Sequence, residues 1–315
     1  MKKYIRSIMI TILLCILFLF LKNQYSSLLL MHSNYGMPAL IKQGKIENLY
    51  IGSSMFRQGL DIMTLEDTMP NADYILAYNG NQPVLEYYQL KKLLDNNVKI
   101  NHLWVDMYVY SAWEIPKISD EKIFMELDLK EKWTMWKLIE DESQTSPSNF
   151  FRMFVSSNNE LLLTWPLNAK LIDSQFYQGG TLTKTSGSTI DVLSQMTAPV
   201  IDAEMNEIQK YYLLQLFQLA KENQLPVTLI ETPKYEIVAS DHNYLSAMSV
   251  YIQLAEQENI PCIISEQTAR YLNISSCQTY TFNHSNPEYF IDALHLSYDG
   301  RILFTKLLIN IKEDF

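Results

Sequence analysis

Cysteine and basic residues are scarce in this sequence, and each shortage argues against a class of protein. The 315 residues include three cysteines, which form no cluster of the kind that binds a metal. Cys262 lies in an apolar stretch and Cys277 in a polar one, so two isolated thiols are favoured, and a disulfide between them is left open. The 25 lysines and arginines stand against 35 acidic residues, a formal net charge of -10 that disfavours a nucleic acid partner. We therefore expect no metal, no other cofactor and no nucleic acid.

The longest apolar run of the sequence stands near its N-terminus. Three basic residues precede the uncharged run from Ile8 to Leu21, and Lys22 follows it. A membrane-spanning helix needs about 20 apolar residues, and basic residues ahead of it favour a cytoplasmic N-terminus. We therefore predict a membrane anchor over residues 1–22 and a juxtamembrane linker over 23–45, with the rest of the chain outside the cytoplasm. A cleaved signal peptide is the alternative, although no clear small-x-small cleavage site follows the run.

Beyond residue 45 the sequence alternates between strand and helix patterns. Predicted strands cover 46–54, 72–80 and 98–108, and Pro83 is placed to start the helix between the second and the third. Consecutive strand, helix and strand units predict right-handed crossovers and a parallel sheet. A hydrophobic content of 48% supplies a sizeable core for one large domain.

The alternation is interrupted and then resumes. From about 110 to 199 the sequence predicts a mainly helical insertion, which includes a surface loop rich in Gly, Ser and Thr, YQGGTLTKTSGST. Further strands are predicted over 226–233 and 260–265, each beside a helical pattern. A last helix follows Ser297, which is a candidate N-cap. The predicted sheet therefore has five strands.

A Gly-Ser-Ser turn ends the first predicted strand. In an open parallel sheet, residues just past the carboxyl ends of the strands face the functional crevice. Gly52 permits a tight turn there, and the following helix directs free N–H groups toward the same point. A serine nucleophile needs a histidine to accept its proton and a carboxylate to orient that histidine. The segment DALH supplies both, because Asp292 precedes His295 by three residues just before the last predicted helix.

The two motifs together resemble those of the SGNH or GDSL-type hydrolases, whose first block is Gly-Asp-Ser and whose last is Asp-x-x-His. The resemblance implies that Ser54 is the nucleophile, His295 the general base and Asp292 its orienting partner. It also implies that Gly80, in YNGNQP, is the oxyanion-hole glycine, and that residues 46–315 form a three-layer α/β/α flavodoxin-like domain. Exported members with Gly-Ser-Ser and an anchor include those of lipoteichoic acid D-alanylation and polysaccharide O-acetylation.

The third block of that family, Gly-x-Asn-Asp, is absent. Asp106 stands near its place, where it either binds a substrate hydroxyl or ends a strand in solvent. Asn79 or Asn81 could substitute for the missing side-chain amide of the oxyanion hole. The loss of one oxyanion donor costs on the order of 3 kcal/mol of transition-state stabilisation. The absence of the third block therefore predicts slow hydrolysis of general ester substrates.

Other residues offer weaker alternatives. Ser53 is a second candidate nucleophile, and His242 and His284 are candidate bases, although both lie in polar loops that favour a surface position. His102 alternates within a predicted strand, which indicates a structural role. For the tryptophans, ordinary packing is favoured over stacking on sugar rings. They are Trp104, Trp113, Trp133, Trp136 and Trp165.

The sequence as a whole predicts an extracytoplasmic serine acyl hydrolase or acyltransferase. By analogy with the family, its substrates are small O-acyl esters, acetyl or D-alanyl, of cell-envelope glycans. One alternative is an acyl relay that works with a membrane-bound O-acyltransferase. The other is a catalytically inactive envelope protein that binds glycan through the tryptophan-rich insertion.

Overall fold

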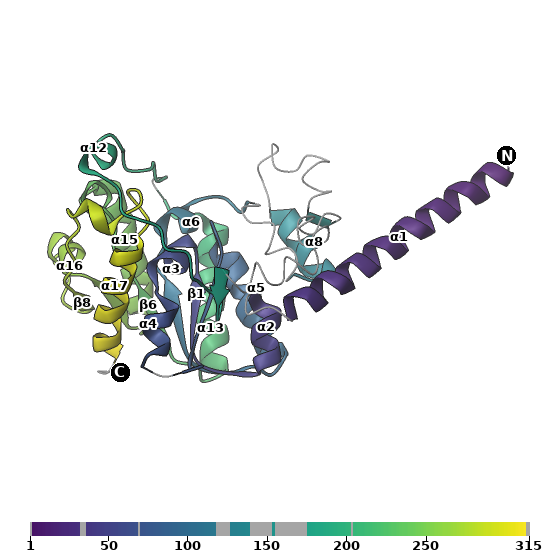
Figure 1. Cartoon of the computed structure of the whole chain (residues 1–315), viewed down its shortest axis with the longest axis horizontal. Helices are drawn as coiled ribbons and strands as arrows, with labels where there is room; N and C mark the ends of the chain where they lie inside the picture. The colour runs from purple at the N-terminus through teal and green to yellow at the C-terminus, as the bar shows by residue number, and fades with distance from the viewer. Residues whose placement is uncertain are drawn as a thin grey trace.

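A parallel sheet of six strands organises the chain (Figure 1). The computed structural model describes residues 2–31, 36–68, 70–117, 127–138, 153–154, 175–202 and 204–312. The strands lie in the order β2-β1-β3-β6-β7-β8, and every neighbouring pair is parallel. Their bounds are β1 Lys45–Gly52, β2 Asp73–Ala77, β3 Lys99–Asp106, β6 Val227–Ile230, β7 Cys262–Ser265 and β8 Gln278–Tyr280.

The predicted sheet of five strands is one strand short. The first five strands of the sheet have the order expected of a flavodoxin-like fold. The missing strand is β8, an edge strand of three residues, in which only Tyr280 is buried. So short a strand with two exposed side chains shows no hydrophobic alternation, and its pairing with β7 places it in the sheet.

Helices cover both faces of the sheet, and the strands alternate between two cores. Leu49 and Ile51 face the first core, whereas Tyr50 between them faces the second. On the first face lie α2 (Gly36–Gln43), α5 (Pro83–Asp95), α13 (Glu207–Glu222) and α15 (His242–Gln257). On the second lie α3 (Ser54–Gly59), α4 (Ile62–Glu66) and α17 (Tyr298–Lys312). The predicted three-layer arrangement is therefore present.

The N-terminal segment contributes one helix to the core and one that extends away from it. Helix α1 (Lys2–Met31) projects from the body in Figure 1. Among the helices of the described residues, none is both long and apolar enough to cross a membrane. The anchor predicted over 1–22 is not supported by this finding. Within the predicted linker, α2 buries Leu40, and the Tyr74 hydroxyl donates a hydrogen bond to the Gly36 carbonyl at 2.8 Å.

The region predicted as an insertion lies partly outside the described residues, which omit 118–126, 139–152 and 155–174 and with them Trp165. Its described elements are α6 (Val109–Trp113), α8 (Leu129–Leu138), the hairpin β4 (Phe176–Tyr177) and β5 (Gly180–Thr181), and α12 (Ile190–Leu193). Trp104 and Trp113 are buried in the core, as packing predicts, whereas Trp133 in α8 is 47% exposed.

The loop predicted at residues 177–189 is partly a packed hairpin. The Gln178 carbonyl accepts the Ile75 N–H at 2.9 Å, which places the hairpin against the edge strand β2. Gly179 has a φ of 76°, and a Cβ added there would collide with the Ile75 carbonyl. The segment after β5 therefore begins at a hairpin that is packed against β2.

Candidate active site

The turn that carries the candidate nucleophile, Gly52-Ser53-Ser54, lies where β1 ends and α3 begins. Gly52 is the last residue of β1, and a Cβ added to it would collide with the Cβ of Asp106 on β3. Ser53 is the N-cap of α3, and its hydroxyl accepts the Met55 N–H at 3.1 Å. Ser54 is the first residue of α3 and is 7% exposed. Glycine is therefore required by the close approach of β3, and the helix start orients Ser54.

Three of the predicted residues form a hydrogen-bonded row. The Ser54 Oγ lies 2.9 Å from the His295 Nε2, across 241 residues of sequence. The His295 Nδ1 lies 2.8 Å from the Asp292 Oδ2 and 3.0 Å from the Oδ1. These distances are within the range for proton transfer between the serine and the imidazole.

The Asp-x-x-His turn holds its own carboxylate. The Asp292 Oδ1 accepts the backbone N–H of Leu294 at 2.8 Å and of His295 at 2.9 Å. Burial raises the pKa of Asp292, but the hydrogen bonds from the His295 ring and from these N–H groups outweigh it, so the pKa is below its ordinary value. Asp292 is therefore ionised at neutral pH and favours the tautomer with hydrogen on Nδ1, which leaves Nε2 free to accept the Ser54 proton.

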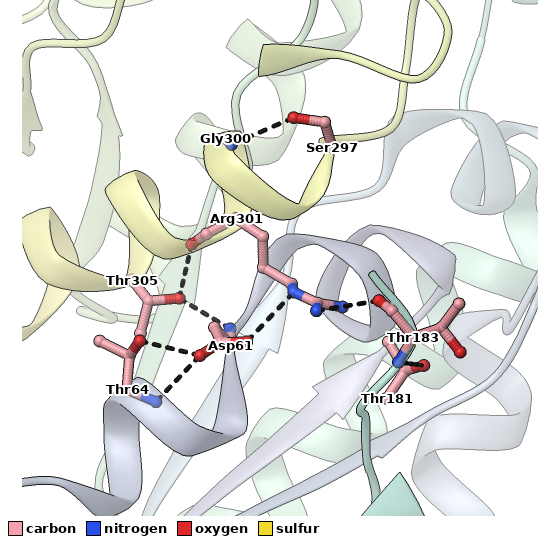
Figure 2. Close-up of polar contacts among 8 residues, drawn as sticks. All are labelled: Asp61, Thr64, Thr181, Thr183, Ser297, Gly300, Arg301 and Thr305. Atoms are coloured by element: carbon pink, nitrogen blue, oxygen red, sulfur yellow. Dashed lines mark hydrogen bonds and ion pairs between the residues drawn. The ribbon is translucent and has the colours of Figure 1, made fainter. Parts of the chain in front are cut away.

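Backbone hydrogen bonds hold the Asp292–His295 turn against the rest of the domain. The Tyr235 N–H donates to the Ala293 carbonyl at 3.0 Å, and the Ile291 N–H to the His295 carbonyl at 2.9 Å. The Ser297 hydroxyl accepts the Gly300 N–H at 3.2 Å at the start of α17, as Figure 2 shows. The predicted N-cap thus begins the helix directly after the histidine.

Asp106, the last residue of β3, contacts the Gly52-Ser53-Ser54 turn. It is 3% exposed, and its Oδ2 accepts the Ser53 hydroxyl at 2.5 Å and the Ser53 N–H at 3.3 Å. The close approach of β1 buries Asp106, so the expectation that it ends its strand in solvent was wrong, while its predicted contact with a substrate hydroxyl stays a prediction. Ser53, fully buried and bonded to Asp106, is likewise poorly placed as the alternative nucleophile.

A buried lysine, which the sequence did not indicate, lies close to Asp106. Lys234 is 1% exposed, and its Nζ donates to the Thr232 carbonyl at 2.7 Å and to the Thr232 hydroxyl at 2.6 Å. Burial lowers the pKa of Lys234 to about 8, against the opposing charges of Asp106 and Glu231. Burial raises the pKa of Asp106 to about 6, against the charge of Lys234 and the bonds from Ser53. The sequence did offer one signal, because Lys234 directly follows the strand predicted over 226–233.

The loop after β2 lies beside the nucleophile turn, because the Tyr78 N–H donates to the Gly52 carbonyl at 3.1 Å. Gly80 in this loop is half-buried with a φ of 59°. Asn79 is exposed, and its Oδ1 accepts from Arg57 at 3.3 Å. Asn81 is fully buried and donates to the Gln89 side chain at 3.0 Å. Burial does not fit the expectation that Asn81 holds an oxyanion, while the predicted role of Gly80 stays a prediction.

The three other histidines of the described residues occupy different settings. His102 stacks on Trp104 with ring centroids 4.2 Å apart, and burial lowers its pKa to about 4. His242 is exposed at the start of α15. His284 was expected at the surface but is 4% exposed, and its Nδ1 lies 2.6 Å from the Lys234 carbonyl. The polar sequence around His284 concealed this burial, which the fold of the flanking loop produces.

A cavity of about 350 Å³ opens beside the hydrogen-bonded row. His295 and Asp292 line it together with Arg57 of α3, three threonines at and after the end of β5, and Arg301 of α17. The sequence signal for Arg57 was its position three residues after Ser54, which places both on one side of α3. In the described part of the chain, no three His, Cys, Asp or Glu side chains gather as a metal site would require, and the three cysteines are free thiols.

No protein-family model matches the sequence, and no curated protein matches it. Among solved structures, it is similar to a candidate acylhydrolase from Bacteroides fragilis, 11% identical, with 85% of this chain and 86% of that chain covered and a TM-score of 0.40. It is also similar to a GDSL-like lipase from Bacteroides thetaiotaomicron, 10% identical, with 87% and 89% covered and a TM-score of 0.38. Since both TM-scores are low, we base the functional proposal on the geometry of the chain's own site.

Proposed function

We propose that this chain is a serine-dependent acyl hydrolase or acyltransferase of the SGNH type. The hydrogen-bonded row of Ser54, His295 and Asp292 is the observation that carries the proposal. Ser54 Oγ attacks the ester carbonyl while His295 Nε2 takes its proton, and Asp292 stabilises the imidazolium that forms. The alcohol leaves with that proton, and water or a glycan hydroxyl then releases the acyl group from Ser54.

The oxyanion is held, in this proposal, by the backbone N–H groups of Ser54 and Gly80. The bond from the Tyr78 N–H to the Gly52 carbonyl supports it, because it brings the Gly80 loop to the nucleophile turn. Asn79 is the remaining candidate for a side-chain donor. The two amide candidates differ in exposure, and only Asn79 lies at the surface.

The proposed substrates are small O-acyl esters, acetyl or D-alanyl, of cell-envelope glycans, outside the cytoplasm. Both the substrates and the location are supported by the sequence resemblance and by the apolar N-terminal run alone. Proteolysis of the domain in intact cells, compared with lysed cells, tests the location. Resistance to the protease in intact cells would contradict it.

An organofluorophosphonate and p-nitrophenyl acetate together test the activity. The proposal predicts that the organofluorophosphonate modifies Ser54 and that the protein hydrolyses p-nitrophenyl acetate. Labelling without turnover would favour an acyl relay that depends on a membrane-bound O-acyltransferase. The absence of the Gly-x-Asn-Asp block is consistent with such a relay. An unreactive Ser54 would contradict the proposal and favour an inactive glycan-binding protein.

A further inference from the structure

The cavity beside the triad lies on the side of the leaving alcohol. In acyl transfer the histidine returns its proton to the leaving oxygen, so the alcohol portion of the ester must lie next to that imidazole. His295 and Asp292 both line the cavity of about 350 Å³. This volume is within the range of small-molecule sites. A group in this cavity therefore belongs to the alcohol rather than to the acyl portion.

One wall of the cavity is a row of threonines. Thr181, the last residue of β5, alternates with Thr183 and Thr185 along the extended chain that follows, and all three line the cavity. Arg301 fixes this segment, because its Nη2 donates to the Thr183 carbonyl at 3.1 Å (Figure 2). The Tyr298 N–H donates to the Thr185 carbonyl at 2.8 Å. A fixed backbone with exposed hydroxyls at Thr183 and Thr185 suits an alcohol that carries further hydroxyl groups.

Charges in the cavity are paired, with one exception. Arg301 is 3% exposed, and its Nε lies 3.4 Å from the Asp61 Oδ1, so its charge is offset within the protein. Asp292 is paired with the His295 ring. Among the described residues, Arg57 contacts neutral groups: the Asn79 Oδ1 at 3.3 Å and the ring of Phe176, whose centroid is 5.4 Å away.

Among the described carboxylates, none forms an ion pair with Arg57. A guanidinium has five N–H donors in a planar fork that matches carboxylate and phosphate oxygens. Its charge also opposes the repulsion that an anion would meet from a chain of net charge -10. The half-buried setting strengthens such a pair, because charge-assisted hydrogen bonds gain in a medium of lower dielectric constant.

We propose that this cavity binds the alcohol portion of the substrate, and that this alcohol carries an anionic group, carboxylate or phosphate, held by Arg57. This inference rests on the proposed acyl-transfer function. It assigns Arg57 to substrate recognition and the exposed Thr183 and Thr185 to the hydroxyl groups of the same alcohol. The acyl group then lies on the opposite side of Ser54.

Three acetyl esters that differ in the charge of their alcohol test the assignment. They are phenyl acetate, which is neutral, 4-acetoxybenzoate, which carries a carboxylate, and 4-acetoxyphenyl phosphate. The wild-type protein is compared with Arg57→Gln, Arg57→Lys and the control Arg270→Gln, which removes an equal charge from an exposed site on another cavity. The ratio of variant to wild-type kcat/KM cancels the intrinsic reactivity of each ester.

Arg57→Gln is expected to lower kcat/KM for the anionic esters by about tenfold or more beyond its effect on phenyl acetate, since hydrogen bonds to charged groups contribute about 1.5–3 kcal/mol. Arg57→Lys keeps the positive charge without the planar fork, so its kcat/KM for the anionic esters should fall less. It also serves as a second variant if Arg57→Gln fails to fold. Arg270→Gln should affect the three esters equally. A larger loss with one anionic ester distinguishes carboxylate from phosphate.

Equal losses with all three esters in Arg57→Gln would overturn this inference and leave the proposed function standing. If no ester is turned over, the rate at which an organofluorophosphonate labels Ser54 provides the second measurement. Glucuronate or glucose 6-phosphate should slow this labelling in the wild type but not in Arg57→Gln, and glucose should slow it less. No slowing by either anion would overturn the inference, whereas an unlabelled Ser54 would overturn the proposed function itself.

Discussion

Two polar clusters meet at the end of β1, one on each side of the Gly52-Ser53-Ser54 turn. In the first, Ser54, which is 7% exposed, contacts His295, which contacts Asp292, and the histidine and the aspartate line the cavity. In the second, Ser53 contacts Asp106, with the charge of Lys234 nearby, and all three are at most 3% exposed. Both clusters combine a serine, an aspartate and a basic residue.

Their surroundings give the two aspartates opposite behaviour. Several hydrogen bonds to the carboxylate outweigh burial at Asp292 and lower its pKa. Burial prevails at Asp106 and raises its pKa to about 6, although Ser53 donates to it and Lys234 lies close. The comparison teaches that the same residue types behave differently according to their burial and the supply of hydrogen-bond donors to the carboxylate.

The largest expected effect is the loss of activity in Ser54→Ala. Without the nucleophile, kcat/KM for p-nitrophenyl acetate should fall at least about a thousandfold, because covalent catalysis is abolished. Steady-state kinetics and mass spectrometry of the organofluorophosphonate-treated protein measure this. Labelling of Ser53 in the variant would contradict the conclusion that burial keeps Ser53 unreactive.

Asp292→Asn should follow, with kcat reduced by about a thousandfold or more. The amide favours the wrong imidazole tautomer and no longer stabilises the imidazolium. Steady-state kinetics measure kcat, and Asp191→Asn on the exposed helix α12 is the matched control for charge. An equal kcat in wild type and Asp292→Asn would rule out a role for this carboxylate.

The pH dependence of stability should change in Asp106→Asn. The folded chain binds the Asp106 proton more tightly than the unfolded chain, so this group makes the protein less stable as pH rises from about 4 to about 6. The decrease is on the order of 1–3 kcal/mol and persists above this range. Urea unfolding at pH 4 and pH 7 should show a smaller decrease in the variant. An equal decrease in the free energy of unfolding in the wild type and in Asp106→Asn would contradict the free-energy cost assigned to burial of the Asp106 carboxylate.

Ser53→Ala is expected to have the smallest effect. Loss of the N-cap and of the donor to Asp106 should lower the free energy of unfolding by about 1–2 kcal/mol. Urea unfolding measures the change, and labelling of Ser54 by the organofluorophosphonate should persist. Loss of labelling in a variant that remains folded would show that Ser53 takes part in the chemistry.

Much of the fold was predictable, because its main strands and helices are long and their side chains follow regular patterns. Helix α13 begins at Glu207, because the Asn206 side chain accepts the N–H groups of Ile208 and Gln209 and caps it there. Strand β8 was missed because two of its three residues are exposed. The threonine segment was predicted as a loop, and Arg301, far along the chain, holds it at the site.

The sequence by itself determined the parallel sheet, the candidate serine turn and the candidate Asp-x-x-His turn, because these depend on local periodicity and on short spacings. Tertiary structure alone decided that Ser54 meets His295 while Ser53 turns to Asp106. It also decided that Arg57 and the threonines share one cavity. The physical reason is that burial and hydrogen-bond partners arise where β1, β3 and α17 converge, and contacts between distant segments leave no mark in the local pattern of residues.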